Sequence, residues 1–387
     1  MTLGIPKESV AGETRVAMTP PALAQLKKGK IECVVESGAG VGAGFGDDAY
    51  REAGATVGSA QEVYKTDVVA KVRALGAGDS SELNHLKDGQ ILVATMDPLG
   101  APEPIAMAAR ARISAFALEL VPRITRAQAM DVLSSQANLA GYKAVLLAAA
   151  HLPKVFPMMT TAAGTITPAK VLVIGAGVAG LQAIATAKRL GAVVSGYDVR
   201  PAVKEQVESL GARFVELPLE TEGAEATGGY AAAKDEAFYA KQRELMAAVI
   251  AEQDVVITTA AVPGMKAPVL VTQVMVEGMR PGSVVVDLAA ERGGNCEVTQ
   301  PGETIEHQGI SILGPVNLPA TMARDASQLF AKNVATFVLN LVDKEGALSL
   351  NLEDEIVRES MVCRDGEVVH PKVRELLKLG DEKAVKA

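Results

Sequence analysis

The chain has 387 residues, of which 49% are apolar and 36 are glycine, so it is long enough for two globular α/β domains with their own cores. Its 38 basic and 46 acidic residues give a net charge of −8, which argues against a nucleic-acid or anionic-membrane surface. Three isolated cysteines, Cys33, Cys296 and Cys363, predict buried thiols in a reducing, cytoplasmic setting. The first residues lack the features of a signal peptide and no apolar run approaches the roughly 18 residues of a membrane span, so we expect a soluble protein.

The first 120 residues alternate short apolar runs with amphipathic segments. Pro20 and Pro21 open a predicted helix that ends at Gly29. The predicted strands of this region are residues 31–36, 67–72, 90–96 and 113–119. This alternation is typical of βαβ units and predicts a mostly parallel sheet.

The rest of the chain predicts two long helices that flank a second α/β region. Residues 134–151 have few helix breakers and predict a long connecting helix. The next predicted strands are 170–175, 255–261, 283–290 and 309–315, and residues 216–236 predict an extended loop. In residues 321–342, six apolar side chains repeat at helical spacing and predict one buried face: Met322, Ala326, Leu329, Phe330, Val334 and Phe337.

These elements predict an α/β fold of two Rossmann-like lobes with mostly parallel sheets, joined by two long helices and with a cleft between the lobes. The first lobe is predicted to be discontinuous, formed by residues 1–130 and 320–387, so that the tail packs back on it. Residues 131–319 are predicted to form an NAD-binding Rossmann domain.

Residues 169–200 contain a G-x-G-x-x-G motif between a predicted strand and a predicted helix. Gly175 permits a tight turn, Gly177 lets a pyrophosphate approach the backbone, and Gly180 lets the helix pack closely on the strand. Strand, turn and helix together predict dinucleotide binding, with Val178 at the helix start as a further contact. The side chains predicted to face the sheet from this helix are Leu181, Ile184, Ala187 and Leu190.

An acidic residue ends the second strand of this motif. Asp198 lies eighteen residues after Gly180, where a carboxylate can accept hydrogen bonds from both ribose hydroxyls and repel a 2′-phosphate. NAD(H) is therefore favoured over NADP(H). Arg200 weakens this argument, since a guanidinium could serve a 2′-phosphate, and both Val199 and Arg200 are predicted to contact the cofactor.

A second glycine-rich stretch, residues 34–48, matches G-x-G-x-x-A at Gly38, Gly40 and Ala43. The letters GFGDD interrupt the place where a helix should begin, and no second strand ends in an acid at the right distance. We therefore favour a structural glycine loop over a second nucleotide site.

Several long stretches resemble one family. GIPKE, GETRVAMTP, ESGAGVGAGFGDDAYREAGA, the fingerprint and GSVVVDLAAERGGNCE are similar to the group that joins alanine dehydrogenases to proton-translocating NAD(P) transhydrogenases. Within that group, PRITRAQAMDVLSSQANLAGYKAV and TGGYA resemble the soluble NAD(H)-binding alpha subunit, or domain I, of the transhydrogenases. The resemblance covers nearly the whole chain. It implies a Re/Si-specific enzyme in which NADH bound here passes a hydride directly to NADP⁺ on a partner domain, coupled to proton translocation by membrane subunits.

The resemblance also implies partners and a location. Some relatives continue into transmembrane helices, whereas this chain stops at DEKAVKA without a span, so it resembles the form with a separate, dissociable subunit. A homodimer on the cytoplasmic face of the inner membrane is implied, with the membrane-spanning subunits and the NADP(H)-binding domain as its partners. We expect no nucleic-acid partner, no membrane insertion and no metal.

The resemblance implies roles for the side chains of the polar stretch at residues 123–142. Arg123, Asp131 and Ser134 would hold the carboxamide and neighbouring parts of the NADH head, and Gln128 would reach towards the partner's NADP⁺ ribose. Hydride transfer between two nicotinamides needs positioning rather than proton transfer, and such side chains suit that task. The residues implied as further NADH contacts are Ile124, Thr125, Arg126, Gly229, Tyr230, Gln242 and Ala261, and the TGGYA stretch is expected to form a mobile lid.

A plainer interpretation of the polar stretch is a helix-capping loop. Thr125 or Ser134 would then be the cap, and Arg126 and Gln136 would be solvated.

An amino-acid dehydrogenase is the alternative function, and it needs a general acid or base beside the nicotinamide. Alanine dehydrogenases have a histidine after the strand that matches 90–96, where this chain has Met96 and Asp97, and an aspartate where it has Glu291. His85 and His370 are predicted to be solvated rather than catalytic.

Two cations match positions that hold the substrate carboxylate in the alanine enzymes. Arg15 and Lys71 are either inherited structural residues or line an unused cleft. Lys266 follows Met265, one place later than the lysine usual in the family, so its role is in doubt. Three hypotheses therefore stay open: a transhydrogenase NAD(H) subunit, an NAD-dependent amino-acid dehydrogenase, and a non-enzymatic NAD-binding module.

Overall fold

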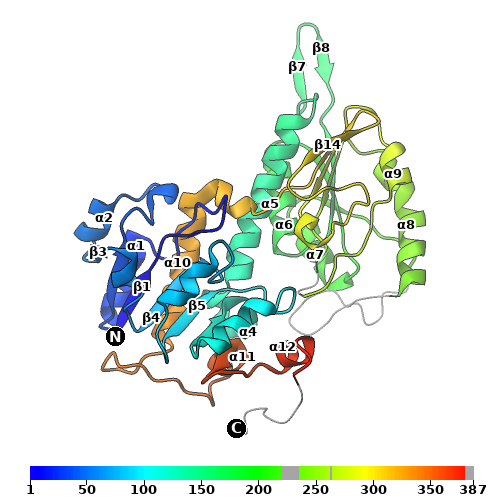
Figure 1. Cartoon of the computed structure of the whole chain (residues 1–387). Coiled ribbons are helices and arrows are strands. Elements are labelled where there is room, and N and C mark those ends of the chain that lie inside the picture. The colour runs from blue at the N-terminus through cyan, green and yellow to red at the C-terminus, as the bar shows by residue number, and fades with distance from the viewer. Residues whose placement is uncertain (220–234, 262–263, 380–387) are drawn as a thin grey trace. The chain divides into compact units, whose positions relative to one another are not determined.

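The computed structural model describes residues 1–219, 235–261 and 264–379 (Figure 1). The chain divides into two compact units, which are Met1–Gln136 with Pro319–Ala387 (unit 1) and Ala137–Leu318 (unit 2). Each unit has a mostly parallel sheet with helices, so the predicted α/β class is confirmed.

Over residues 1–136 and 319–379, the sheet of unit 1 has eight strands. In spatial order these are β17 (Glu367–Val368), β16 (Met361–Arg364), β6 (Ser114–Ala117), β5 (Ile91–Thr95), β4 (Val68–Arg73), β1 (Thr2–Ile5), β2 (Glu32–Glu36) and β3 (Thr56–Gly58). The strands from β6 to β3 run parallel, whereas β16 from the tail pairs antiparallel with both of its neighbours, β6 and β17. The chain leaves β1 in one direction through β2 and β3 and returns on the other side as β4. The strand order of unit 1 therefore reverses between β1 and β4, which is where open α/β sheets usually form a ligand site.

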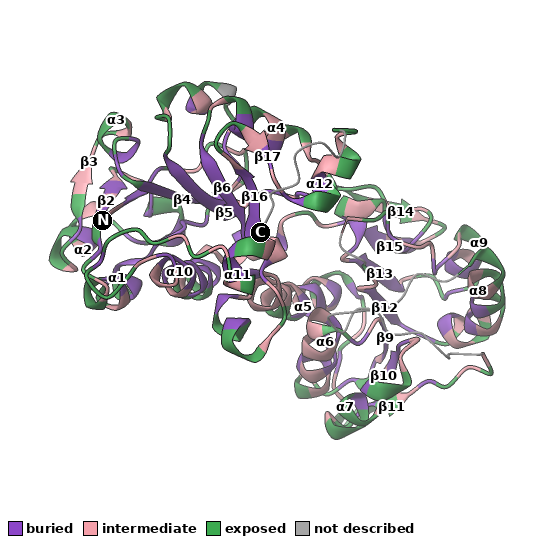
Figure 2. Cartoon of the chain, turned by 90° about the horizontal axis from the view of Figure 1, so that it is seen from below, coloured by how far each residue is buried: buried purple, intermediate pink, exposed green. Residues whose placement is uncertain are grey.

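Helices cover both faces of this sheet because successive residues of a buried strand point to opposite sides. In β4, Val68 and Ala70 belong to one core, which contains α1 and α10, and Val69 belongs to the other, which contains α4. The helices of unit 1 are α1 (Pro20–Lys28), α2 (Asp47–Glu52), α3 (Ala60–Val63), α4 (Glu103–Arg110), α10 (Ala323–Leu339), α11 (Glu355–Ser360) and α12 (Pro371–Leu376). Figure 2 shows the central strands of the sheet as buried.

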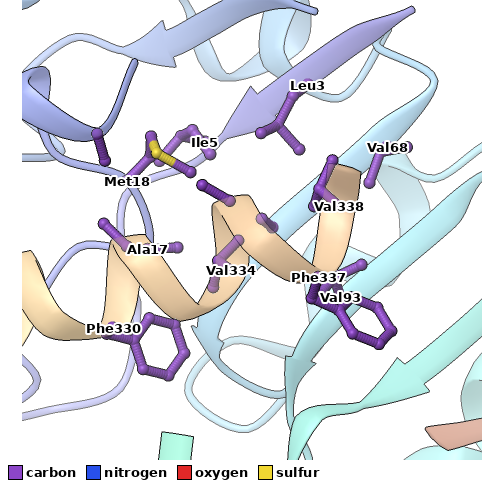
Figure 3. Close-up of a cluster of buried hydrophobic side chains, with 14 of the residues drawn as sticks. Leu3, Ile5, Ala17, Met18, Val68, Val93, Phe330, Val334, Phe337 and Val338 are labelled. Carbon is purple, nitrogen blue, oxygen red and sulfur yellow. The ribbon is translucent and has the colours of Figure 1, made fainter. Parts of the chain in front are cut away.

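Helix α10 packs its apolar face into the first core. Figure 3 shows its Val334, Phe337 and Val338 lying among Leu3, Val68 and Val93 of the strands. The predicted apolar face is correct for Ala326, Phe330, Val334 and Phe337 but wrong for Leu329, which is 36% exposed. Leu329 lies about 100° around the helix from Phe330, so it sits at the edge of the stripe rather than on it.

In the described part of unit 2 the sheet has seven strands, all parallel except for β14. In spatial order these are β11 (Arg213–Phe214), β10 (Val193–Tyr197), β9 (Lys170–Ile174), β12 (Val255–Thr258), β13 (Val284–Asp287), β15 (Ile310–Leu313) and β14 (Thr304–His307). Its helices are α6 (Val178–Arg189), α7 (Lys204–Ser209), α8 (Glu236–Ala251) and α9 (Gln273–Glu277). The strand order reverses between β9 and β12, and the glycine motif directly follows β9 at this point.

The predicted long helix is present as α5 (Val132–His151), and it begins two residues earlier than expected. After it, β7 (Met159–Thr161) and β8 (Gly164–Ile166) form an exposed hairpin of their own that the sequence did not suggest (Figure 1). The predicted strand 113–119 ends at Ala117, and a short 3₁₀ turn, η3 (Leu118–Leu120), takes its place. Within the stretches of chain that the structure describes, we find no helix that is long and apolar enough to cross a bilayer.

Candidate functional site

The glycine motif of unit 2 forms a tight strand-to-helix turn. Gly175 follows β9 with a φ of +98°, a region that glycine adopts without strain. A Cβ at Gly180 would lie 1.8 Å from the Gly175 carbonyl oxygen, so only glycine lets α6 pack this closely on the turn. Of the residues predicted to face the sheet, Ile184 and Ala187 are fully buried, and Leu181 and Leu190 pack against the same core.

The N-terminus of α6 is open for an anion. Among the residues that the structure describes, a Cβ at Gly177 would meet no atom within 4 Å, and no side chain caps the helix, which begins at Val178. The first N–H groups of a helix lack intrahelical partners and favour negative charge. This geometry fits the pyrophosphate of a dinucleotide.

Asp198 ends β10 beside this turn and is already engaged. Its Oδ2 accepts from the Ala176 N–H at 2.7 Å and from Arg200 Nη2 at 2.8 Å. Its Oδ1 accepts from the N–H and Nε of Arg200, both at 2.9 Å. Asp198 stands where a ribose-binding acid is predicted, but Arg200 faces the carboxylate rather than a cofactor phosphate. Val199 packs its side chain against the core of unit 2.

Gln242 of α8 supplies a buried polar group without a full set of partners. It is 2% exposed and interacts with the Tyr197 hydroxyl, and no described residue hydrogen-bonds its Oε1. A buried acceptor without a partner is costly, and a ligand donor would satisfy it. The open helix end and this acceptor both fit a bound dinucleotide.

Sequence reasoning missed Asn295, which is fully buried and holds the loop after β12. Its Oδ1 accepts from the Ala260 N–H at 3.0 Å, and its Nδ2 donates to the carbonyls of Ala260 and Pro268 at 2.8 and 2.9 Å. The predicted contact Ala261 follows directly and is exposed. The only sequence signal for Asn295 is its place in the GGNCE stretch.

Two predicted contacts, Gly229 and Tyr230, lie outside the described residues, as does most of the predicted extended loop. Met265 is exposed, and the side-chain carbons of Lys266 lie close to Gly293. Among the described residues, His, Cys, Asp and Glu side chains nowhere gather in threes that could hold a metal ion.

The polar stretch of unit 1 forms a 3₁₀ turn, η4 (Thr125–Met130), that runs into α5. The cap of α5 is Asp131, not Thr125 or Ser134 as the capping interpretation predicted. Asp131 Oδ1 accepts from the Ser134 N–H at 2.8 Å, and Oδ2 accepts from the Ser134 hydroxyl at 2.6 Å. A carboxylate just before the first turn satisfies an orphan N–H there, which serine within that turn cannot do in the same way.

Of the two predicted contacts Arg123 and Gln128, only Arg123 faces the carboxylate of this cap. Arg123 Nε lies 4.0 Å from Asp131 Oδ2, so the two charges face one another. Gln128 is exposed, and no described residue hydrogen-bonds its side-chain amide. Ile124 packs against the core of unit 1, whereas the Thr125 side chain makes no cap hydrogen bond. Arg123, Asp131 and Ser134 therefore form one cluster that Gln128 does not join.

The two residues that the capping interpretation left in solvent are both engaged. Both terminal nitrogens of Arg126 donate to Asp354, the N-cap of α11, and this contact lowers the pKa of that carboxyl. Gln136 accepts from Arg15 Nη1 at 2.9 Å and donates to the Ala326 carbonyl. These contacts, which cross long stretches of sequence, fix the polar stretch on α10 and α11.

Glu119 is a second residue that sequence reasoning missed. It lies in η3, directly before the polar stretch, and its Oε1 accepts from the N–H groups of Met96 and Asp97 at 2.7 and 2.8 Å. Asp97 has a φ of +50°, so this carboxylate supports an unusual turn at the end of β5. Burial raises the pKa of Glu119 to about 7, against the effect of the two N–H donors. The signal available in the sequence was an acid directly after an apolar strand.

A buried charged cluster occupies the point in unit 1 where the strand order reverses. Lys71 is fully buried, with Glu82 Oε1 at 2.5 Å and Glu8 Oε2 at 4.0 Å. Arg15, also buried, meets Glu13 through Nε at 2.8 Å and Nη2 at 2.6 Å. Burial raises the pKa of Glu8 to about 7, although Lys71 opposes the shift. Arg15 and Lys71, the two cations that match a substrate-carboxylate site, are thus already paired with carboxylates of the chain itself.

One of the two predictions about the histidines is wrong. His85 is exposed and stacks on Tyr64, as a solvated side chain can. His370 was predicted to be solvated, but it is buried at the start of α12, and burial lowers its pKa. It is the residue directly before Pro371, which opens the helix. All three cysteines are buried free thiols.

The second glycine-rich stretch is a structural loop, as we favoured. A Cβ at Gly42 would lie 2.8 Å from the Thr14 carbonyl oxygen, and one at Gly40 would lie 2.6 Å from the Tyr50 ring. Asp47, at the start of α2, accepts from the Gly38 N–H at 2.8 Å and the Ser37 hydroxyl at 2.7 Å. The helix end that a phosphate would need is therefore filled by this loop's own contacts.

The strand reversal, the glycine turn and the open helix end define unit 2 as a Rossmann-type dinucleotide-binding unit. The alanine dehydrogenase/PNT N-terminal domain matches residues 4–140 and the C-terminal domain of the same name matches residues 144–371. This chain belongs to the alanine dehydrogenase/PNT family.

Relatives within the family differ in their distance from this chain. An NAD(P) transhydrogenase alpha subunit of Rhodospirillum rubrum is 49% identical over 96% of this chain and 98% of that protein. A crystal structure of transhydrogenase from Sinorhizobium meliloti matches with a TM-score of 0.84 and 46% identity, over 96% of this chain and 99% of that one. Alanine dehydrogenase of Bacillus subtilis is 27% identical over 96% of this chain and 94% of that protein. The transhydrogenase branch is thus the nearer of the two.

Proposed function

We propose that this protein is the NAD(H)-binding subunit of a proton-translocating NAD(P) transhydrogenase. It holds the NADH whose hydride passes directly to NADP⁺ on a partner domain, and membrane subunits couple the transfer to proton movement. The observation that carries the proposal is the Arg123, Asp131 and Ser134 cluster, which is built for positioning and has no acid or base histidine beside it among the described residues. The similarity to transhydrogenase alpha subunits supports it.

The residues divide the task between binding and positioning. When bound, NADH supplies the hydride from its nicotinamide ring. The turn at Gly175, Gly177 and Gly180 binds the pyrophosphate, and Asp198 binds the ribose. Arg123, Asp131 and Ser134 hold the carboxamide, which fixes the ring in an attack geometry that needs no proton transfer.

The remaining cofactor contacts are proposed from the family resemblance. Arg126 has its guanidinium on Asp354, so its role in binding falls to its backbone or its side-chain stem. Gly229 and Tyr230 remain predictions. Arg200 likewise has its guanidinium on Asp198, so a binding role falls to its backbone. The other residues in this group are Ile124, Thr125, Val178, Val199, Gln242 and Ala261.

The structure disfavours the amino-acid dehydrogenase alternative. Met96, not histidine, follows β5, and it is buried. A small carboxylate substrate would also need Arg15 and Lys71, and these already have Glu13 and Glu82 as partners. Replacing either internal carboxylate would remove the short ion pair of a buried cation, which is costly.

One assay tests the proposal. Purified protein is mixed with NADH, an NADP⁺ analogue and a candidate NADP-binding partner domain, and hydride exchange is followed by absorbance. We expect exchange only when both proteins are present. NADH formation that depends on alanine, by this chain alone, would refute the proposal, and NADH binding without exchange would favour a non-enzymatic module.

We expect Gln128→Asn to slow hydride exchange at saturating NADH by about tenfold while NADH affinity stays within a few fold. The reason is that Gln128 is exposed and does not join the Arg123 cluster, so shortening it affects reach towards the partner and not NADH binding. NADH fluorescence titration and stopped-flow rates measure the two quantities. Gln61→Asn, at an exposed glutamine of α3, is the control and should change neither. A large loss of NADH affinity with an unchanged rate constant would contradict the assignment.

We further propose that the protein is a homodimer and that the β7–β8 hairpin contributes to the contact. The hairpin and its approach expose Met158, Met159 and Ile166, which are 65%, 44% and 45% accessible. Exposed apolar side chains gathered on one small element are typical of an interface. We expect Met159→Asp to shift the sedimentation equilibrium towards monomer, whereas Val274→Asp at an exposed valine of α9 should not. A wild-type monomer would contradict this proposal.

The dimer is proposed to lie on the cytoplasmic face of the inner membrane. Membrane-spanning transhydrogenase subunits and the NADP(H)-binding domain would hold it there, since the net charge of −8 offers no attraction to an anionic bilayer. Co-sedimentation with membranes that contain those subunits, compared with membranes that lack them, tests the placement.

A further inference from the structure

The carboxylate of Asp198 has no free acceptor position. A carboxylate offers about four lone-pair sites, and four N–H groups donate to this one. They are the backbone N–H groups of Ala176 and Arg200 and the Nε and Nη2 of the Arg200 side chain, at 2.7 to 2.9 Å. Both side chains of the ion pair are largely buried, at 12% exposure for Arg200 and 5% for Asp198.

The four donors differ in their freedom to move. The Ala176 N–H lies in the glycine turn, which is fixed by the hydrogen bond of the Gly175 N–H to the Tyr197 carbonyl at 2.8 Å. The Arg200 N–H is two residues from Asp198 in the same short loop. Only the guanidinium can leave by rotating its side chain, because its stem has several rotatable torsions.

We propose that the Arg200 guanidinium is an internal competitor for the ribose site and must turn away from Asp198 when a dinucleotide binds. The inference rests on the proposed function, in which Asp198 binds the ribose of NADH. Two ribose hydroxyls need two acceptor positions, and the two side-chain bonds of Arg200 are the ones that can be given up. Arg200 therefore weakens NADH binding, which suits a subunit that must release its nucleotide after each hydride has passed.

The direction of the effect separates competition from ordinary attraction. NADH carries a negative pyrophosphate, so removing a nearby cation should weaken binding if Arg200 acts through its charge or contacts the cofactor. If Arg200 competes, removing it should strengthen binding. We expect Arg200→Met to lower the NADH dissociation constant by about threefold to tenfold, the range of one partly buried ion pair.

The test measures NADH fluorescence titrations and thermal melting for each variant. Arg189→Met, at an exposed arginine near the end of α6, controls for loss of charge in unit 2 and should change the dissociation constant by less than about twofold. In an Asp198→Asn background, Arg200→Met should no longer tighten binding, because the competition is lost with the charge. This background checks that the effect acts through Asp198.

Arg200→Gln serves as the second variant in case Arg200→Met folds poorly, since its amide can still donate one hydrogen bond to Asp198. The proposal is judged on whichever of these two variants has a melting temperature within a few degrees of wild type. Equal or weaker NADH binding by that variant would overturn the proposal, and weaker binding would make Arg200 a cofactor ligand. Wild-type protein that does not bind NADH would instead refute the proposed function, so the two failures are distinguishable.

Discussion

Gly180→Ala is expected to remove NADH binding and to destabilise the protein. The new Cβ would stand 1.8 Å from the carbonyl oxygen and 2.8 Å from the carbonyl carbon of Gly175, both of them backbone atoms. Neither atom can yield without moving α6 away from β9, so the turn that should hold the pyrophosphate must distort. We expect roughly a hundredfold loss of NADH affinity or more, and a loss of about 3 kcal/mol in the free energy of unfolding. Fluorescence titration and denaturant unfolding measure the two effects.

Gly177→Ala is the matched control, because the same methyl group enters open space. No atom of the described part of the chain lies within 4 Å of the new Cβ, so stability should stay within about 0.5 kcal/mol of wild type. NADH affinity should still fall, since the methyl group occupies the approach of the pyrophosphate. If Gly180→Ala kept wild-type stability and affinity, the close packing of α6 on the turn could not be what positions the cofactor.

Asp131→Asn is expected to slow hydride exchange by roughly tenfold or more without unfolding the helix start. Asparagine caps helices about as well as aspartate, so the bond from the Ser134 N–H should persist. The negative charge that faces Arg123 Nε at 4.0 Å is lost, and the guanidinium is then held less firmly at the carboxamide. Small errors of position cost much when two reacting atoms must be held close together. Single-turnover rates with the partner domain report the effect.

Asp131→Ala separates the two roles of the residue. It removes both the charge and the cap, so the rate should fall as in Asp131→Asn and the free energy of unfolding should fall by a further amount of about 1 kcal/mol. If Asp131→Asn exchanged hydride at the wild-type rate while Asp131→Ala did not, the residue would be a helix cap alone. Equal stability of the two variants would mean that the cap contributes nothing.

The fold was largely predictable because its signals are local. Buried parallel strands form short apolar runs, and the expected strand 67–72 is found as Val68–Arg73. Proline at the start and glycine at the end mark the two ends of α1. Three glycines between a strand and a helix predict the tight turn at Gly175. The exposed Leu329 was predicted wrongly, because helical periodicity shows that α10 has an apolar stripe but does not show how wide the buried part of that stripe is.

The supporting contacts of the polar stretch could not be predicted in the same way. Arg126 and Asp354 are separated by 228 positions, and Arg15 and Gln136 by 121. No local pattern links such residues, and each alone is ordinary for a surface. The buried state of His370 was missed as well, because a polar residue near a chain end gives no local signal of burial. Glu119 was closer to prediction, since it follows an apolar strand directly.

The cluster at the strand reversal of unit 1 has a consequence for anyone who would redesign this scaffold. Two carboxylates of the chain itself, on Glu13 and Glu82, take the places on Arg15 and Lys71 that a free acid would need. Installing a histidine after β5 would therefore not be enough to create a small-acid oxidoreductase. The two internal acids would have to be removed together with it, and Glu8, which shares Lys71 and whose pKa is raised to about 7, would have to be rebalanced. Glu13 and Glu82 therefore occupy, within unit 1 itself, the positions on Arg15 and Lys71 that a small carboxylate substrate would need.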